Sequence, residues 1–442
     1  MKAYRSAILR FATDSEPRHA AVYESDGLLV VGANAQGTQV VLAVGPYLAL
    51  KDQFPGVTVE HLPGRIIAPG FVDMHIHFPQ TDVIGSPSDG LLPWLEDYTF
   101  PEEKRFLAPE YSVQAATFFI AELLRNGVTT ALCFATSHPE SVNALFAEAQ
   151  AKNMRLITGL CLMDRNAPVD VLNLAAPDGS NDATEQSLID TEKLINQWHG
   201  KGRLGYAITP RFAPTSSEAQ LRGAGELAAK YPDVWIQSHV SENKDEIAWA
   251  RALFPKSVSY LATYADFGLM RDRAIYAHCI HFDDDDRALM RATGAAAAVS
   301  PTSNLFLGSG FFDYAAADRA GFYYGLASDV GGGTSFSPFH TMLAAYYVGR
   351  EGQTKPGVSL SPQHLWWQHT VGAAQALGLD GRQGRPAVGN LQPGCEADFV
   401  VLNPQVTPLL ARRTARADSL DELLFAMIVL GDDRLIERTV IY

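Results

Sequence analysis

The chain has 442 residues, of which 47% are hydrophobic and 19% charged, so its composition is that of a protein with an apolar core and not of a disordered one. The formal net charge of −14 disfavours nucleic acid and anionic membranes as partners, because both attract basic protein faces. The length exceeds one ordinary small domain and suits a large barrel with additions, or two or three domains.

Cysteine use and the amino terminus indicate the compartment. Cys133, Cys161, Cys279 and Cys395 lie far apart and form no CxxC pair, which favours buried, reduced thiols in a cytosolic protein. The first residues, MKAYRSAILRFATDSEP, lack the long apolar stretch of a signal peptide. No window approaches the roughly 18 consecutive apolar residues of a membrane span. We therefore expect a cytoplasmic protein.

The two ends of the chain share one pattern. Residues 1–67 contain short apolar runs separated by turn signals, which predicts a β-meander. Residues 389–403 and 434–442 return to the same strand-like, glycine-punctuated style. We therefore predict that residues 1–67 and 376–442 pair into one small β-sandwich domain.

The middle of the chain alternates between strand-like and helix-like stretches. Eight βα units in about 300 residues predict an α/β fold of the (β/α)8 TIM-barrel type over residues 68–375. A doubly wound open sheet is the main alternative, but no glycine-rich phosphate turn follows the first strand. The predicted strands are residues 66–78, 128–136, 154–163, 204–212, 233–241, 273–281, 294–301 and 322–330.

One acidic run could be misread as a cation site. Asp283–Asp286 are four consecutive carboxylates, and four neighbours in sequence cannot all converge on one ion. Carboxylates are favourable in the first turn of a helix because they interact with the helix dipole. We predict a solvated helix start there.

Polar side chains collect at the carboxyl ends of the predicted strands, which is the face where barrels of this type carry their function. His75 and His77 stand two residues apart, so alternation along the strand points both into the barrel mouth. The full set at this rim is His75, His77, Arg211, His239, His278 and Asp329.

A single histidine at a strand end is more often a hydrogen-bonded structural residue than a ligand. That reading is kept for the other histidines considered, namely His19, His61, His138, His199, His340, His364 and His369. At the rim, however, imidazoles from three strands coincide with an aspartate. Neutral imidazole and carboxylate suit Zn²⁺, with Fe²⁺ or Mn²⁺ as alternatives, and the sequence predicts one such ion per subunit.

A divalent ion lowers the pKa of a bound water toward about 7, so a second group must move protons. Glu242 follows His239 by three residues, at the start of the next helix, where its carboxylate can reach both water and substrate. We predict it to be the general acid and base. Without the histidines, a simple carboxylate at a helix N-terminus would be the preferred reading. Asp329 can bind the ion and also accept a proton.

The HxH strand, the single histidines on two later strands and the aspartate on the eighth resemble the amidohydrolase superfamily. The stretch GNLQPGCEADFVVL resembles the segment that closes the small domain of that family. The fourth strand, AITPRFAP, lacks the bridging lysine of two-metal members, so the chain looks like the one-metal branch, where deaminases are frequent. Within that branch, most of the chain is similar to the guanine-deaminating family. The stretches that carry this likeness include PGFVDMHIHFPQ, LLPWLEDYTFPEE, ITPRFAPTSS, SHVSEN, SPTSNLFLGSG and SDVGGGTSFS.

The resemblance implies roles for individual residues. It implies zinc ligation by His75, His77, His239, His278 and Asp329, and catalysis by Glu242, Asp329 and His278. It implies a purine site formed by Gln80, Arg211, Phe212, His239, Glu242 and Asp329. The implied reaction is hydrolytic deamination of guanine to xanthine and ammonia, by a homodimer.

The side-chain chemistry agrees with an oxo-purine substrate. Arg211 suits a carbonyl oxygen, Phe212 can stack on a flat ring, and the Gln80 amide can donate and accept along a purine edge. For Phe212 alone, core packing would be the preferred reading. Trp94, Tyr98 and Phe100 form either a lid over the base or a loop packed on the barrel rim.

Two alternative functions remain. One is a deaminase of the same branch that acts on another purine, a pterin or an s-triazine. The other is a non-catalytic scaffold, which the complete set of ligand residues disfavours. The deaminases of nucleic-acid bases carry an HxE…PCxxC signature, and this sequence lacks that cysteine pair.

Overall fold

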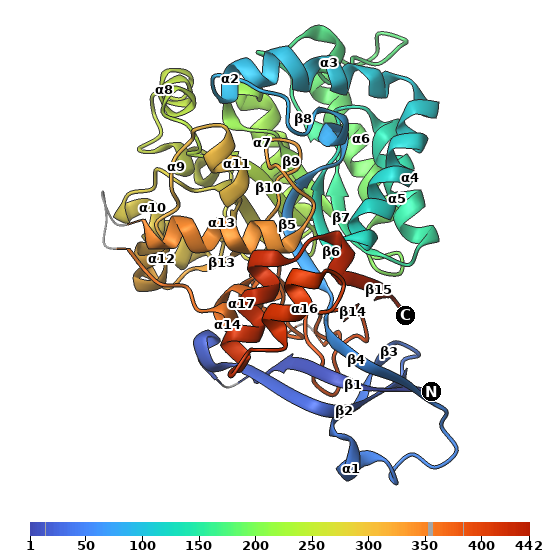
Figure 1. Ribbon diagram of the computed structural model, residues 1–442. Helices are drawn as coiled ribbons and strands as arrows, with labels where there is room; N and C mark the ends of the chain where they lie inside the picture. Colours follow the sequence, from blue (N-terminus) through green and yellow to red (C-terminus); the bar gives the residue numbers. More distant parts are fainter. Residues whose placement is uncertain (14, 352–356, 383) are drawn as a thin grey trace.

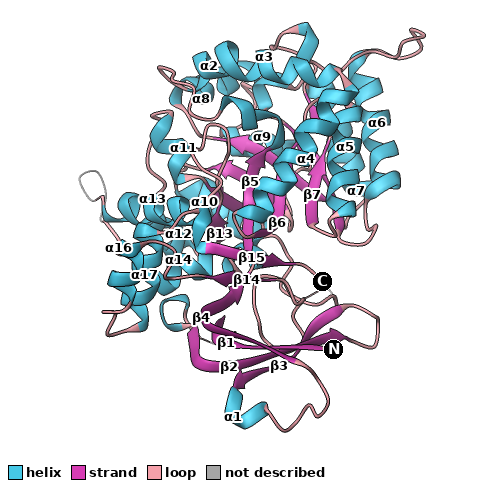
Figure 2. Ribbon diagram, turned by 45° about the vertical axis from the view of Figure 1, so that its right-hand side comes forward, coloured by secondary structure: helices cyan, strands magenta, loops and turns pink. Residues whose placement is uncertain are grey.

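The computed structural model describes residues 1–442 except residue 14, residues 352–356 and residue 383. The described residues form a barrel of parallel strands wrapped by helices, with a second sheet below it (Figure 1). Both ends of the chain lie beside that second sheet (Figure 2).

The barrel strands follow one another in chain order around the sheet. The order is β5-β6-β7-β9-β10-β11-β12-β13, and the short β8 (Cys161–Leu162) pairs with β9. Between β5 and the chain after β13, the N–H of His77 donates to the carbonyl of Val330 and the N–H of Asp329 donates to the carbonyl of His75, at 2.8 and 2.9 Å. These bonds join the two ends of the sheet. The strands are β5 (Phe71–His77), β6 (Val128–Phe134), β7 (Arg155–Gly159), β9 (Leu204–Pro210), β10 (Trp235–Val240), β11 (Ala274–His278), β12 (Ala296–Val299) and β13 (Tyr323–Leu326).

The barrel strands are covered on both faces, which explains their nearly continuous apolar sequences. Every residue of β5, β6 and β9 is buried. The covering helices are α4 (Pro109–Arg125), α5 (Pro139–Ala151), α6 (Ala183–Trp198), α7 (Glu218–Lys230), α8 (Lys244–Leu253), α9 (Tyr260–Asp266), α10 (Asp284–Thr293), α11 (Pro301–Phe306), α12 (Tyr314–Ala320), α13 (Pro338–Arg350), α14 (Pro362–Gln368) and α15 (Val371–Ala376).

The predicted helix start at the acidic run is confirmed. Asp283 is the N-cap of α10, and its side chain accepts a hydrogen bond from the N–H of Asp286. The N-cap bond satisfies a backbone donor that the helix itself leaves free. The carboxylates therefore serve the helix terminus.

The small domain is a six-stranded sheet in the order β15-β14-β4-β1-β2-β3. The predicted (β/α)8 barrel and the separate β-domain built from both ends of the chain are confirmed, and the strands expected to form a β-sandwich belong to one six-stranded sheet. Its strands are β1 (Lys2–Phe11), β2 (Ala21–Ala33), β3 (Gln39–Pro46), β4 (Val59–Pro69), β14 (Phe399–Leu402) and β15 (Ile436–Val440).

The boundaries 1–67, 68–375 and 376–442 stay a proposal. β4 continues to Pro69, just before the first barrel strand begins at Phe71. The C-terminal part also contains α16 (Pro408–Thr414) and α17 (Leu420–Leu430), and α17 packs against the barrel helices α13 and α14.

A buried ionic cluster joins the barrel to the small sheet. Arg203 donates to Glu396 at 2.5 Å and also bonds Asp398, and Arg155 bonds Glu396. Both arginines lie at the amino ends of barrel strands, and both carboxylates lie just before β14. The cluster is therefore at the opposite end of the barrel from the predicted site.

Residues 78–107, called the cover segment below, cross the carboxyl ends of the strands (Figure 1). The segment is built from short helical turns and contains a π-helical turn between α2 and α3. In the described part of the chain, no helix is long and apolar enough to cross a membrane. The elements of the cover segment are η2 (Phe78–Val83), α2 (Leu91–Trp94), η3 (Leu95–Thr99), α3 (Phe100–Glu103) and η4 (Lys104–Leu107).

Candidate active site

The five residues predicted as ligands converge at the carboxyl end of the barrel. The Nε2 atom of His77 lies 3.2 Å from the Nε2 atoms of both His75 and His239. Asp329 Oδ1 lies 3.1 Å from His75 Nε2 and 3.2 Å from His77 Nε2, and Asp329 Oδ2 lies 3.6 Å from His278 Nε2. Atoms bound to one ion at 2.0–2.1 Å stand about 3 to 4 Å apart, so these separations fit a shared divalent cation.

Two of the imidazoles are held in the tautomer that a metal requires. His239 Nδ1 donates to the carbonyl of Arg211 at 2.6 Å, and His278 Nδ1 donates to Oδ1 of Asn304 at 2.8 Å. With the proton on Nδ1, the lone pair of Nε2 faces the centre of the site. Such outer hydrogen bonds are the usual way that proteins orient ligand histidines.

Burial fixes the charge state of these groups. It lowers the pKa of His77 to about 3, and burial together with the neighbouring His75 and His77 lowers the pKa of His239 well below its usual value. Burial alone would raise the pKa of Asp329, but the surrounding His75 and His278 outweigh it and lower that pKa well below its usual value. Neutral imidazoles beside an ionised carboxylate are the donor set that zinc takes.

The loop after β13 is shaped around Asp329. Asp329 has φ of 52°, in the left-handed region that aspartate tolerates better than most side chains. A Cβ on the neighbouring Gly331 would lie 2.3 Å from the carbonyl oxygen of Gln80, so only glycine fits at this approach. Asp73, on the same strand as His75 and His77, accepts hydrogen bonds from the N–H groups of His75 and Ser328. It thereby joins β5 to the chain just before Asp329.

Glu242 lies beside the convergence point. Its Oε1 accepts from the hydroxyl of Ser309 at 2.9 Å, and its Oε2 lies 3.3 Å from His278 Nε2. Burial, together with the nearby Asp329, raises the pKa of Glu242 to about 8. The carboxyl can therefore hold or release a proton close to neutral pH.

A second buried carboxylate, Glu246, was not predicted. Its Oε2 accepts from the backbone N–H groups of Glu242 and Asn243, and its Oε1 accepts from the Tyr260 hydroxyl at 2.7 Å. Glu246 closes a capping box with Asn243 at the start of α8. The Asn-x-x-Glu spacing of residues 243–246 could have predicted this capping box from the sequence. The box fixes the helix start and, with it, the backbone of Glu242.

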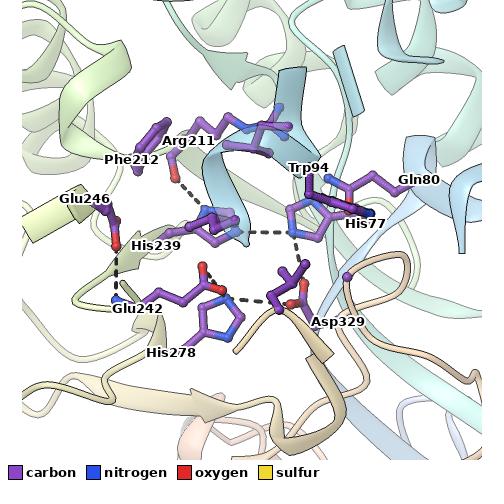
Figure 3. A pocket seen from close by; sticks show the side chains of 14 residues that line it. His77, Gln80, Trp94, Arg211, Phe212, His239, Glu242, Glu246, His278 and Asp329 are labelled. Atoms are coloured by element: carbon purple, nitrogen blue, oxygen red, sulfur yellow. Dashed lines mark hydrogen bonds and ion pairs between the residues drawn. The ribbon is translucent and has the colours of Figure 1, made fainter. Parts of the chain in front are cut away.

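A pocket opens beside these groups (Figure 3). The predicted purine-site residues all line it, and the cover segment supplies part of the wall. The lining residues are His77, Gln80, Leu91, Trp94, Leu95, Arg211, Phe212, His239, Glu242, Glu246, His278, Leu307, Asp329 and Gly332.

Arg211 and Phe212 both reach the pocket because β9 ends at Pro210. Past the strand end, neighbouring residues need not point to opposite faces. Phe212 is buried, and its ring packs edge-on against Trp249 at a centroid distance of 5.9 Å. Phe212 therefore lines the pocket and also packs in the core, so both roles considered for it from the sequence apply.

The Arg211 guanidinium is paired, which the sequence did not predict. Its Nη1 donates to both carboxylate oxygens of Glu103, at 2.8 and 2.7 Å, and its Cζ lies 5.5 Å from the centre of the Phe100 ring. Burial alone would lower the pKa of Arg211, but Glu103 outweighs it and the pKa is raised. Glu103 lies within the stretch LLPWLEDYTFPEE, 108 positions before Arg211. No regular spacing in the sequence predicts a contact between residues so far apart.

Gln80 has only one free end. Its Oε1 accepts from the N–H of Gly331 at 3.2 Å, so the amide NH2 group is the part left to bind a ligand. The sequence predicted that the Gln80 amide would both donate to and accept from a purine edge. In the structure its oxygen is bonded to Gly331, so donation by the NH2 group is the part of that prediction that fits. In the cover segment, Trp94 lines the pocket and Phe100 packs at Arg211. Tyr98 is not among the lining residues and packs, partly buried, against the apolar cluster to which Trp94 and Phe100 belong.

The chain is similar in sequence and in fold to known proteins. Residues 66–441 match the model of the amidohydrolase family. A guanine deaminase of Escherichia coli is 43% identical over 415 residues, which are 94% of this chain and 89% of that protein. A solved structure of E. coli guanine deaminase superposes with a TM-score of 0.92 at 41% identity, covering 100% of this chain and 98% of that one. A guanine deaminase of C. acetobutylicum, solved with guanine in its active site, superposes with a TM-score of 0.88 at 29% identity, covering 99% and 98%.

Proposed function

The chain belongs to the amidohydrolase family, and from this premise we propose that it is a zinc-dependent guanine deaminase that converts guanine and water to xanthine and ammonia. The observation that carries the proposal is the convergence of four imidazoles and Asp329 next to a pocket lined by Glu242, Arg211 and Gln80. The likeness to the C. acetobutylicum enzyme solved with guanine supports the choice of substrate.

The residues that would hold the ion are His75, His77, His239, His278 and Asp329, one ion per subunit. The short separations between their Nε2 and carboxylate atoms suit zinc, and the same donor set accepts Fe²⁺. A divalent ion bound there lowers the pKa of a coordinated water, which supplies the nucleophile at neutral pH.

Glu242 moves the protons. Its carboxyl takes the proton that the attacking water loses as the water oxygen bonds to C2 of guanine. It delivers that proton to the ring nitrogen next to C2. It then takes the remaining proton of the new C2 hydroxyl and passes it to the amine, so that the C2–N bond breaks, the C2 carbonyl forms and ammonia leaves. Asp329 is the alternative acceptor for the first proton. His278, whose Nε2 lies 3.3 Å from Glu242 Oε2 and 3.6 Å from Asp329 Oδ2, polarises the reacting centre.

The pocket walls place the purine. Arg211 donates to the 6-carbonyl oxygen, and the Gln80 NH2 group donates to a ring acceptor. Phe212 and Trp94 supply apolar surface for the flat ring. These contacts hold C2 and its amine toward Glu242 and the rim histidines.

Guanine turnover tests the function directly. Zinc-loaded protein should release one ammonia for each guanine lost and should accumulate xanthine, measured by ultraviolet absorbance and an ammonia assay. Adenine, a pterin and an s-triazine serve as comparison substrates. A protein that retains zinc but leaves guanine unchanged would refute the proposal, and preferential turnover of a comparison substrate would reassign the substrate.

We further propose that the enzyme acts in the cytoplasm as a homodimer, on the strength of its resemblance to the family. Light scattering of the purified protein should give twice the mass of the 48.0 kDa chain. A mass of one chain at micromolar concentration would contradict the dimer.

A further inference from the structure

Glu103 holds the Arg211 guanidinium, which lies in the wall of the proposed purine site. Phe100 and Glu103 stand three residues apart on α3, so they share one helix face. That face presents an aromatic ring and a carboxylate to Arg211. The relative exposures of the Glu103 and Arg211 side chains are 1% and 4%, so solvent screens their interaction little.

The pair makes this side of the pocket nearly neutral. His138 after β6 and Cys161 on β8 also interact with the pair. Burial lowers the pKa of His138, and it raises the pKa of the Cys161 thiol to about 12, so both are uncharged at neutral pH. Glu103 is therefore the group that balances Arg211.

Charge balance matters because the reaction changes the acidity of the purine. Replacing the C2 amine by a second carbonyl leaves a ring N–H between two carbonyl groups, which makes xanthine more acidic than guanine. Xanthine ionises near neutral pH, whereas guanine stays neutral there. An unpaired buried guanidinium would retain such an anion, since opposite charges attract strongly in a site of low dielectric constant.

We propose that Glu103 sets the charge selectivity of the purine site, so that the site admits a neutral oxo-purine and disfavours an anionic one, including the ionised product. This inference rests on the proposed function, because it assigns Arg211 to the purine carbonyl. Glu103 acts through Arg211 and is a positioning and selectivity residue that does not touch the substrate. The consequence for the reaction is faster release of the product.

The test compares Glu103→Gln with the wild type in zinc-loaded protein. Glutamine keeps the side-chain size and an oxygen that accepts from Arg211, but removes the negative charge. The ligands are urate, which is anionic, and hypoxanthine, a neutral oxo-purine without the amine, with binding measured by titration calorimetry. Glu103→Gln should bind urate about tenfold more tightly and change hypoxanthine binding less than about threefold. Glu102→Gln is the matched control, since Glu102 pairs with Arg105 and Tyr111, and neither of these lines the pocket.

Equal loss of affinity for both ligands in Glu103→Gln would overturn the inference, because it would show a purely structural role. A second measurement does not depend on the variant folding. Between about pH 6 and pH 8, wild-type protein should lose more affinity for xanthine than for hypoxanthine, which stays neutral and reports the effect that titration of Glu242 has on both ligands. Xanthine binding that, relative to hypoxanthine binding, is equal or tighter at about pH 8 than at about pH 6 would also overturn the inference about Glu103. Binding is measured without turnover, so failure of guanine deamination would refute the proposed function separately.

Discussion

Glu242 combines burial, a raised pKa and a place beside the rim histidines. Glu242→Gln keeps the shape of the side chain but removes its proton transfer, so kcat for guanine should fall about 10²–10⁴-fold with zinc content unchanged. Ammonia release and elemental analysis measure the two quantities. The control Glu110→Gln removes an exposed carboxylate at the start of α4 and should leave both unchanged. Full activity of Glu242→Gln would assign the proton transfer to another group, and Asp329 would be the next candidate.

Asn304 determines which nitrogen of His278 carries the proton. Asn304→Ala removes the acceptor for Nδ1, so we expect about 10–100-fold weaker zinc retention. A chelator titration followed by elemental analysis measures this loss. The exposed Asn196→Ala serves as the control for removing an amide side chain. Zinc retention equal to the wild type would show that packing alone orients the imidazole.

At the scale of elements, the cover segment closes the mouth of the barrel. Trp94 is buried and lines the pocket, whereas Tyr98, one turn later, lies outside it. Trp94→Ala should lower kcat/KM for guanine by on the order of tenfold or more, because the ring loses a wall that positions it. It should also reduce the free energy of unfolding by about 3–5 kcal/mol, the usual cost of truncating a buried tryptophan. Steady-state kinetics and denaturant unfolding measure both effects.

The matched variant in the same segment is Tyr98→Ala. The Tyr98 side chain packs, partly buried, against the same apolar cluster but does not line the pocket, so the variant should lose some stability while keeping most of kcat/KM. Equal kinetic losses in the two variants would mean that the segment acts through its fold as a whole.

At the scale of the whole molecule, the Arg203 cluster joins the barrel to the small sheet. Arg203→Met leaves two buried carboxylates with less compensation, so the variant should lose about 3–5 kcal/mol of unfolding free energy near neutral pH. Denaturant titration measures the loss. Arg434→Met, which breaks an exposed pair with Asp432, is the control and should change stability little.

The loss in Arg203→Met should depend on pH. Burial raises the pKa of Asp398 above the ordinary 3.8 even though Arg203 lowers it. A carboxyl with a higher pKa in the folded state contributes stability below the unfolded pKa and loses it as pH rises through the folded pKa. Removing Arg203 raises the folded pKa further, so the deficit of the variant should be small near pH 4 and grow toward pH 8. A deficit that is constant with pH would show that lost packing, and not charge, is the cause.

The sequence alone determined the barrel and most of its rim. Period-two alternation placed His75 and His77 on one face, and the carboxyl ends of parallel strands meet at one edge, so His239, His278 and Asp329 had to lie near them. The role of each of these residues stays a proposal, but their convergence follows from the order of the strands. No pattern in the sequence linked Arg155 and Arg203 of the barrel to Glu396 and Asp398 before β14, so the ionic cluster between the two sheets was not predicted.

Only the tertiary structure decided how the rim residues are held. Glu103 meets Arg211 across 108 positions of sequence, Ser309 meets Glu242 across 67, and Asn304 meets His278 across 26. No local periodicity specifies such contacts, because they depend on how loops and short helices pack over the barrel mouth. The alternation of apolar and polar residues and the order of the strands determine which residues reach the rim. Packing between segments distant in sequence determines their hydrogen-bond partners and their protonation, and hence the chemistry that the site can perform.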